Sequence, residues 1–282
     1  ERGVPADADT IYHAGSCSKA FLGTAFMQLE DAGRASVEAP LTAVIPEFSM
    51  RPRFPAAPPV TIRSLLNHHA GLPGDFFNGM ITTRVLAEAD YVASILACLR
   101  ADYPFAPPDQ RAMYGNTGFL LASAALSRLV GRPFPAAMRQ LLLDPLGMAD
   151  SSFAPDTPAI AARLAAAYNA QRVRRPPEYL NAQGSGSLYT SARDLTRFLR
   201  MLLADGRFAF TSTRNGAFWA AGSGTYEGDA TRYLERPLMA SYPLENGGSY
   251  EFRYTLEGDT WTLERWDGGR RVEREVWTRV GR

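Results

Sequence analysis

The sequence predicts an α/β (α+β) fold in which a helix-rich first part is followed by an antiparallel β-meander. Two observations support this fold class. Before residue 206, three segments carry apolar residues at helical spacing, whereas after it apolar and polar residues alternate between glycine-containing turns. These two periods are typical of amphipathic helices and of half-buried strands. The change of period predicts one domain over residues 1–206 and a β-rich segment over residues 207–282.

The composition permits a packed core and excludes several kinds of partner. Of 282 residues, 46% are hydrophobic, which suffices for one large domain or two smaller ones. The net charge of +1 gives the whole molecule no attraction to nucleic acid or to an anionic membrane. No apolar run approaches the roughly 20 residues that a membrane-spanning helix needs. Histidines and carboxylates are not spaced as metal ligands, so we expect neither a metal nor a cofactor.

The cysteines and the first residues say little about the compartment. Cys17 and Cys98 are too few for a disulfide framework, so the redox environment stays open. The chain opens with Glu1-Arg2-Gly3, without an initiator methionine or a visible signal peptide. We therefore expect that it starts in mid-protein.

The first predicted helix follows Ser16. Gly33 is a plausible end of this helix. The apolar residues that fall on one face of it are Phe21, Leu22, Ala25, Phe26 and Leu29. Ser16 then lies at the helix start and Lys19 one turn further on, so the hydroxyl and the amine can meet on one face.

Ser16 and Lys19 have the chemistry of a nucleophile and its base. Lys19 is the only lysine among thirty basic residues, and an amine can lose its proton where a guanidinium cannot. A serine hydroxyl needs such a base, and a helix N-terminus favours the oxyanion formed on acylation. The alternative is a helix-capping serine beside a solvated lysine, the commoner case for this motif alone. Cys17 is interpreted as a small packing residue.

Two further helices are predicted downstream. The first runs from Phe119 to Val130 and ends at Gly131 and Pro133. Tyr114 and Asn116 lie on the loop before it, where a phenol can relay a proton and an amide can hold a substrate carbonyl. A turn with a packed tyrosine is the simpler interpretation of this pair alone. The second helix is predicted to end at Asp205-Gly206. Its apolar residues at helical spacing are Leu195, Phe198, Leu199, Met201 and Leu202.

The segment after residue 206 carries the pattern of a β-meander. Two stretches of residues alternate in polarity, and a glycine-containing turn follows each of them, at residues 257–259 and 267–269. The alternating positions are Tyr250, Phe252, Tyr254 and Leu256 in the first stretch, and Trp261, Leu263 and Arg265, less regularly, in the second.

The motif Ser16-Cys17-Ser18-Lys19, followed much later by Tyr114-Gly115-Asn116, resembles the β-lactamase-related serine hydrolases. That group includes class C β-lactamases, penicillin-binding proteins with D-alanyl-D-alanine peptidase activity, and esterases. Three more segments in family order are similar to it: Leu65-Leu66-Asn67-His68-His69-Ala70-Gly71-Leu72, Asp144-Pro145-Leu146-Gly147-Met148, and Gly186-Ser187-Leu188-Tyr189-Thr190-Ser191-Ala192-Arg193-Asp194-Leu195. The resemblance covers residues 1 to about 206.

The resemblance implies a β-lactamase/transpeptidase-like fold and an acyl-enzyme mechanism. It implies Ser16 as the nucleophile, Lys19 as its base, Tyr114 as the proton donor to the leaving group and Asn116 as a substrate-binding residue. The substrate is a small molecule or peptide: a β-lactam, a D-amino-acid peptide or an ester. By analogy the protein acts in the periplasm, outside the cell or at the cell envelope.

Two other patterns are assigned no chemistry. In the family the histidine of the segment containing His68 and His69 shapes a turn, so we expect a structural role here. Gly184-Ser185-Gly186 resembles a phosphate-binding loop but is not followed by a lysine, and we expect a plain turn.

The sequence departs from the family at the third motif, Lys-Thr-Gly or His-x-Gly. It has no lysine after residue 19 and no histidine after residue 69, and Arg214-Asn215-Gly216 is a weak substitute. Few residues precede Ser16, so the sheet is predicted to be incomplete at both edges. We therefore favour esterase or peptidase-like activity over efficient β-lactamase activity. The alternative is a catalytically impaired binding or interaction module.

Residues 207–282 resemble the second half of a small lipocalin-like domain, on the segments Ala221-Gly222-Ser223-Gly224-Thr225-Tyr226 and Glu275-Val276-Trp277-Thr278-Arg279-Val280. A half-barrel exposes strand edges, which favours docking on the first domain or self-association through this segment. It could also replace the missing hydrolase strands.

Overall fold

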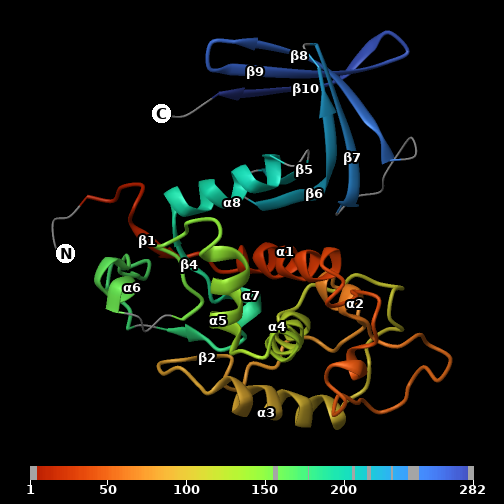
Figure 1. Cartoon of the computed structure of the whole chain (residues 1–282), viewed down its shortest axis with the longest axis vertical. Helices are drawn as coiled ribbons and strands as arrows, with labels where there is room; N and C mark the ends of the chain where they lie inside the picture. The colour runs from red at the N-terminus through yellow and green to blue at the C-terminus, as the bar shows by residue number, and fades with distance from the viewer. Residues whose placement is uncertain are drawn as a thin grey trace. The chain divides into compact units, whose positions relative to one another are not determined.

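The computed structural model describes residues 5–154, 158–176, 178–204, 207–214, 217–229, 231–240 and 248–278. The chain divides into two compact units, residues 1–197 and 198–282 (Figure 1). The functional boundary after residue 206 stays a prediction. The mixed α/β class and the terminal β-meander are confirmed, and each unit is described below by itself.

The first unit is mainly helical, and its strands pair in twos. Its helical elements are α1 (Ser18–Asp31), η1 (Leu41–Ala43), α2 (Ile62–Leu66), α3 (Glu88–Arg100), α4 (Thr117–Val130), α5 (Phe134–Met138), η2 (Arg139–Leu143), α6 (Pro158–Arg163), α7 (Gln183–Gly186) and the start of α8 (Ala192–Ala204). Its strands are β1 (Ile11–His13), β2 (Ile81–Thr82), β3 (Tyr179–Leu180) and β4 (Tyr189–Ser191).

Helix α1 buries the apolar face that its sequence predicts. All five residues of that face are at most 2% exposed: Phe21, Leu22, Ala25, Phe26 and Leu29. The helix ends at Asp31, and Gly33 follows two residues later with a φ of 65°, a left-handed conformation that glycine adopts at low cost. Arg34 N then donates to Leu29 O at 2.8 Å, which satisfies one of the last helical carbonyls.

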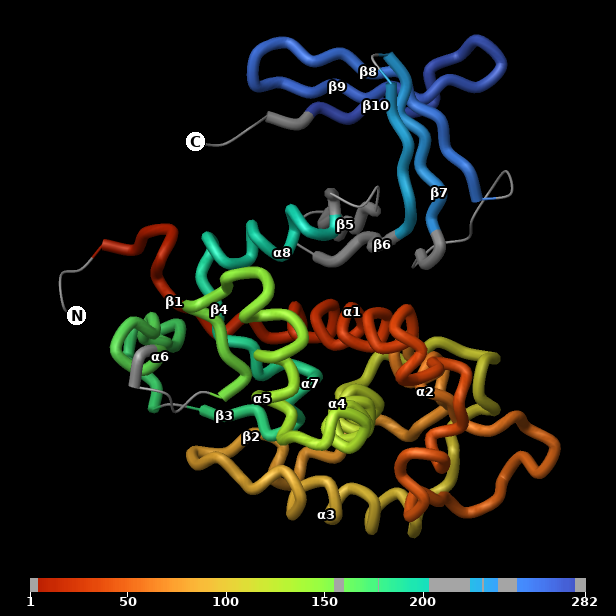
Figure 2. Tube along the Cα trace, viewed as in Figure 1, coloured from red at the N-terminus to blue at the C-terminus, as the bar shows by residue number. Residues whose placement is uncertain are grey.

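Helix α4 forms the centre of the first unit. It lies between α1 and α3, as both Figures 1 and 2 show. Every residue from Phe119 to Leu126 is buried, which explains why the predicted apolar run has no polar stripe. Gly131, with a φ of 73°, ends the helix as predicted. The loop before α4 therefore leads into a fully buried helical segment.

The strand pair β1–β4 joins two distant parts of the chain. The strands are antiparallel, with Ile11 opposite Ser191 and His13 opposite Tyr189. The pairing continues past the strands, since Ala14 N donates to Leu188 O at 2.8 Å and Gly15 forms a parallel bridge with Ser187. As a result, the turn before α1 lies beside α7.

The second unit is a six-stranded antiparallel meander in the order β10-β9-β8-β7-β6-β5. Its strands are β5 (Arg207–Arg214), β6 (Ala217–Gly228), β7 (Arg232–Ala240), β8 (Tyr250–Glu257), β9 (Thr260–Asp267) and β10 (Arg270–Thr278). The predicted turn glycines Gly258, Gly268 and Gly269 have φ values of 59°, 51° and 80°, which suit tight hairpins. The lipocalin likeness and the self-association remain predictions.

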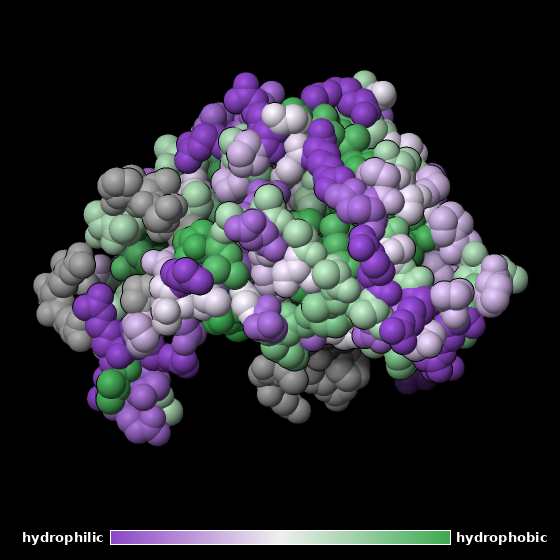
Figure 3. All heavy atoms as spheres, turned by 90° about the horizontal axis from the view of Figure 1, so that it is seen from below, coloured by the Kyte–Doolittle hydropathy of each residue, from purple (hydrophilic) through white to green (hydrophobic). Residues whose placement is uncertain are grey.

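Both polar and apolar side chains reach the surface of the first unit. Hydrophobic atoms lie between hydrophilic ones on the face drawn in Figure 3. Exposed apolar side chains include Phe77 at 73% and Ile81 at 56%. Among the residues that the structure describes, no helix is both long enough and apolar enough to cross a bilayer.

Candidate active site

Ser16 lies in the turn just before α1, two residues ahead of the first helical residue. Gly15 makes this turn with a φ of 52°. Ser18 holds it in place, since its hydroxyl donates to Gly15 O at 2.7 Å and accepts from Leu188 N at 2.9 Å. Ser16 itself is exposed, so its hydroxyl is open to a molecule arriving from solvent.

Lys19 lies one turn further on and is 9% exposed. Its Nζ is 3.2 Å from Ser16 Oγ, 2.9 Å from Asn116 Oδ1 and 2.7 Å from the Ser185 carbonyl oxygen. The amine also lies over two aromatic rings, 4.8 Å from the centroid of Tyr114 and 5.3 Å from that of Phe119. The structure thus brings together Ser16 and Lys19 as the helical spacing predicts.

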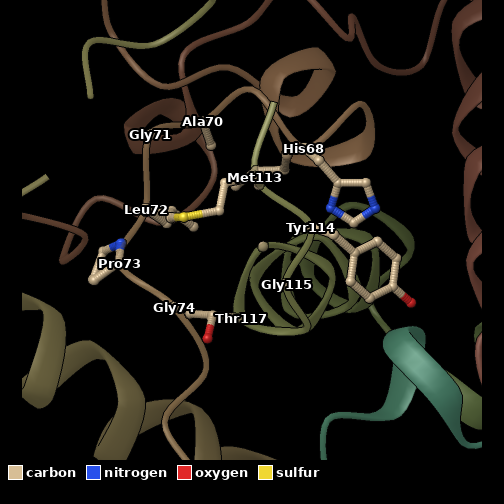
Figure 4. A pocket seen from close by; sticks show the side chains of 12 residues that line it. His68, Ala70, Gly71, Leu72, Pro73, Gly74, Met113, Tyr114, Gly115 and Thr117 are labelled. Carbon is tan, nitrogen blue, oxygen red and sulfur yellow. The ribbon is translucent and has the colours of Figure 1, made fainter. Parts of the chain in front are cut away.

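Tyr114 approaches Ser16 from the loop before α4. Its hydroxyl lies 2.6 Å from Ser16 Oγ, and 61% of the residue is exposed. The rings of Tyr114 and His68 lie side by side in Figure 4, with centroids 4.6 Å apart, and the Tyr114 hydroxyl points away from the other labelled residues. The Tyr114 ring thus lies against both the His68 ring and the Lys19 amine, although most of the residue is exposed.

Asn116 hydrogen-bonds both to Lys19 and to Asp75, an acid that no sequence motif indicated. Its Nδ2 donates to Asp75 Oδ2 at 2.7 Å, and its backbone N–H donates to Asp75 Oδ1. Because a carboxylate only accepts hydrogen bonds, the Nδ2 atom must face Asp75 and the Oδ1 atom must face Lys19. Asp75 lies in a loop three residues after Leu72, and no local pattern distinguishes it.

The segment Gly184-Ser185-Gly186 is not the plain turn that we expected. It forms α7, whose Ser185 carbonyl accepts the hydrogen bond from Lys19. A Cβ atom at position 184 would lie 2.6 Å from Leu22 Cδ2 and 2.8 Å from Ser123 Cβ, so only glycine fits there. Gly184 therefore allows α7 to approach α1 and α4 closely.

His68 and His69 support the loop of Tyr114. His68 adopts a φ of 64°, its carbonyl accepts from Met113 N at 2.8 Å, and its ring packs on Tyr114 and Phe119. Burial, and then the charge of Lys19, lower the pKa of His68 to about 4. The ring is therefore neutral at physiological pH. His69 Nδ1 instead bonds with Asn67 O at 2.8 Å.

A cavity of about 20 Å³ lies behind the same loop, lined by residues that include Leu72, Met113 and Gly118 (Figure 4). It has room for about one water molecule. The cavity is therefore too small for a substrate. In the described part of the chain, no cluster of three or more His, Cys, Asp or Glu residues is placed to hold a metal ion.

The substitute third motif is the segment Arg214-Asn215-Gly216. The Arg214 side chain and residues 215–216 lie outside the described residues. Leu188 does take part in the site, because its backbone carbonyl and N–H hold the turn of Ser16 through Ala14 and Ser18.

The hydrogen bonds around Ser16 are satisfied whether or not the Lys19 amine carries its third proton. A neutral amine donates to Asn116 and Ser185 and accepts the proton of Ser16, while Tyr114 donates to Ser16 Oγ. An ammonium donates to all three, and Ser16 then donates to Tyr114. A proton can consequently move between Lys19, Ser16 and Tyr114 without any heavy atom moving far, which is what acyl transfer to a serine requires.

The family described as Beta-lactamase matches this chain over residues 1–273. Penicillin-binding protein 4 of Amycolatopsis lactamdurans is 28% identical over 276 residues, covering 94% of this chain and 66% of that protein. Esterase EstB of Burkholderia gladioli is 26% identical over 312 residues, covering 94% of this chain and 77% of that protein. The chain thus spans roughly two thirds to three quarters of the length of these two relatives.

The fold has solved counterparts. The structure of a β-lactamase/D-alanine carboxypeptidase from Yersinia pestis, complexed with citrate, superposes with a TM-score of 0.58 at 17% identity. The match covers 94% of this chain and 77% of that one. At this identity the likeness shows the β-lactamase/transpeptidase-like fold alone.

Proposed function

Because the chain belongs to the Beta-lactamase family, we propose that it is a serine hydrolase that cleaves an ester or amide bond through an acyl-enzyme on Ser16. One observation carries the proposal: Ser16 Oγ lies 2.6 Å from Tyr114 OH and 3.2 Å from Lys19 Nζ. A hydroxyl held between a phenol and a nearly buried amine has both a proton acceptor and a proton donor within reach.

In the proposed acylation step, Ser16 Oγ attacks the substrate carbonyl carbon and its proton passes to Lys19. The carbonyl oxygen becomes an oxyanion, for which the Ser16 backbone N–H at the start of α1 is one proposed donor. The bond to the leaving group then breaks, Tyr114 gives its proton to the departing oxygen or nitrogen, and the proton held by Lys19 passes to Tyr114 to replace it. Asn116 orients the substrate carbonyl. Water, activated by the same groups, releases the acid and regenerates Ser16.

We favour an ester, or a peptide-like amide, over a β-lactam as the substrate. The family's third motif provides a cation that binds a substrate carboxylate. Here no lysine follows residue 19 and no histidine follows residue 69. A neutral substrate needs no such cation. The relative EstB carries the name of an esterase, which supports this preference at 26% identity.

The test is covalent labelling of the folded protein. We expect a fluorophosphonate probe to add one phosphonyl group to Ser16, detected by peptide mass spectrometry, and the adduct to disappear in Ser16→Ala. The matched control is Ser36→Ala, since Ser36 is also an exposed serine that precedes a turn, and its hydroxyl accepts a hydrogen bond from Glu38 N. A labelled penicillin, tested in parallel, reports whether β-lactams acylate the same residue.

A second candidate is a catalytically impaired member that binds ligands without turnover. The absence of the third motif from the sequence favours this candidate. In the family that motif supplies the cation that binds the substrate carboxylate, and its strand supplies the second donor to the oxyanion. Folded protein that gains no adduct on Ser16 from either probe would establish this alternative instead of the hydrolase.

A further inference from the structure

We propose that Asp75 is a positioning residue that fixes the side-chain amide of Asn116 and thereby places the Lys19 amine for proton exchange with Ser16. The inference deepens the proposed function and rests on it for the catalytic meaning of that placement. Asp75 lies outside the motifs that resemble the family, and it acts on Lys19 through Asn116, since its carboxylate accepts from Asn116 and Thr117.

The geometry consists of three donors that converge on one carboxylate. Asn116 Nδ2 donates to Oδ2 at 2.7 Å, Asn116 N donates to Oδ1, and Thr117 N donates to Oδ1 at 3.3 Å. Hydrogen bonds to an ionised acceptor are about twice as strong as neutral ones. Asp75 therefore holds both the backbone and the side chain of Asn116.

The carboxylate also decides which end of the amide faces the lysine. Lys19 Nζ lies 2.9 Å from Asn116 Oδ1, a contact that requires the oxygen on that side. If the amide turned over, its NH₂ group would face the amine and one acceptor of Lys19 would be lost. An acceptor-only partner such as Asp75 enforces this orientation, whereas an amide at position 75 could pair with either end of the Asn116 side chain.

Asp75 has a second, purely structural effect that the test must separate from the first. By accepting from Asn116 N and Thr117 N it caps the beginning of α4, which carries no capping side chain of its own. Loss of a helix cap lowers stability whether or not the Lys19 amine is displaced. Stability alone therefore cannot test the proposal, and a signal from the Lys19 amine is needed.

The sequence provides that signal, since Lys19 is the only lysine. Protein labelled with ¹⁵N,¹³C-lysine gives one side-chain resonance, whose shift with pH reports the protonation of this amine without any contribution from turnover. The groups that face the amine are Ser16, Tyr114, Asn116 and the Ser185 carbonyl, and the neutral His68 ring lies against Tyr114.

The decisive variant is Asp75→Asn, which keeps the shape and the cap oxygen but offers an NH₂ group to Asn116 Nδ2. We expect the Asn116 amide to turn over. The Lys19 titration midpoint should then move to lower pH by at least about 1 unit, because the ammonium loses both an acceptor and a nearby negative charge. Acylation of Ser16 should slow by about 10- to 100-fold through misplacement of the base. Asp75→Glu, which keeps the acceptor-only head, should recover part of both effects.

Asp109→Asn is the matched control. It removes the same charge from an exposed residue whose φ of 64° asparagine also tolerates, and we expect the wild-type titration. A midpoint in Asp75→Asn equal to that of the control overturns the proposal, whatever the stability change. A shifted midpoint in a protein whose Ser16 is never labelled supports the positioning of Lys19 by Asp75 and overturns the hydrolase assignment, so the two failures are distinct.

Discussion

Lys19 Nζ donates to the carbonyl oxygen of Ser185 at 2.7 Å, although 166 positions separate the two residues in the sequence. The bond joins α1 to α7 and occupies one of the amine's hydrogen-bonding positions with an acceptor that cannot titrate. Asn116 Oδ1 occupies a second. The remaining position faces Ser16 Oγ at 3.2 Å. Two contacts of the Lys19 amine are thus structural, and the third is with Ser16, whose proton Lys19 is proposed to take.

This arrangement predicts that Lys19→Arg abolishes acylation of Ser16 even though it keeps a positive charge. A guanidinium stays protonated in proteins and cannot accept the serine proton, and general base catalysis is typically worth about 10²- to 10⁴-fold. The measurement is the rate of fluorophosphonate labelling, with far-UV circular dichroism to confirm folding. Labelling at the wild-type rate would reduce Lys19 to electrostatic support.

The short contact between Tyr114 and Ser16 predicts a dependence on the leaving group. If Tyr114 protonates the departing oxygen, Tyr114→Phe should slow hydrolysis of an alkyl ester by about 10²-fold or more. A 4-nitrophenyl ester should be affected much less, because its phenolate leaves without a proton. The comparison of the two esters is made on the same preparation. An equal loss for both would mean that Tyr114 acts on the serine proton and not on the leaving group.

Local periodicity predicted the elements that carry the site. The apolar spacing from Phe21 to Leu29 and the run from Phe119 to Leu126 are the buried faces of α1 and α4. The same rule, applied to Tyr91, Val92, Ile95, Leu96 and Leu99, would have found α3, whose buried face has helical spacing. The strand pattern and turn glycines likewise predicted β8 and β9.

The contacts that complete the site could not be predicted from local patterns. Asp75 lies 41 residues before Asn116, and Ser185 contributes a backbone carbonyl, which every residue has. Neither leaves a signal in composition or period, because their roles depend on packing between elements that are distant in sequence. Gly184 leaves a partial signal, since a glycine there marks a close approach, but the sequence does not say to what.

The close approach of α7 predicts that Gly184→Ala destabilises the protein. The added methyl group would meet Leu22 and Ser123 at distances under 3 Å, so the helices must separate. Overpacking of this kind costs about 1–3 kcal/mol, and it should displace the Ser185 carbonyl and slow labelling of Ser16 as well. The measurement is the free energy of unfolding in urea.

Gly23→Ala is the matched control for this variant. Gly23 lies inside α1, and a Cβ atom there would meet nothing within 4 Å. Alanine at this position should therefore stabilise the helix by about 0.5–1 kcal/mol. If both substitutions change stability in the same direction and by similar amounts, helix propensity and not the packing of α7 explains the result.

The buried ring of His68 predicts a loss of stability in mild acid. Its pKa is lowered to about 4 in the folded protein, chiefly by burial and then by Lys19, whereas in the unfolded chain it is near the ordinary 6.5. Between these values the unfolded state binds a proton that the folded state does not, so the free energy of unfolding rises with pH in this window and falls as pH drops from 6.5 towards 4. Because the ring keeps some solvent access, we expect a contribution on the order of 1 kcal/mol between pH 7 and pH 5.

Urea unfolding of the wild type and of His68→Asn measures this contribution of His68, since asparagine tolerates the φ of 64° at this position. The variant should lose this part of the pH dependence, and an unchanged slope between pH 5 and pH 7 would mean that His68 titrates alike in both states.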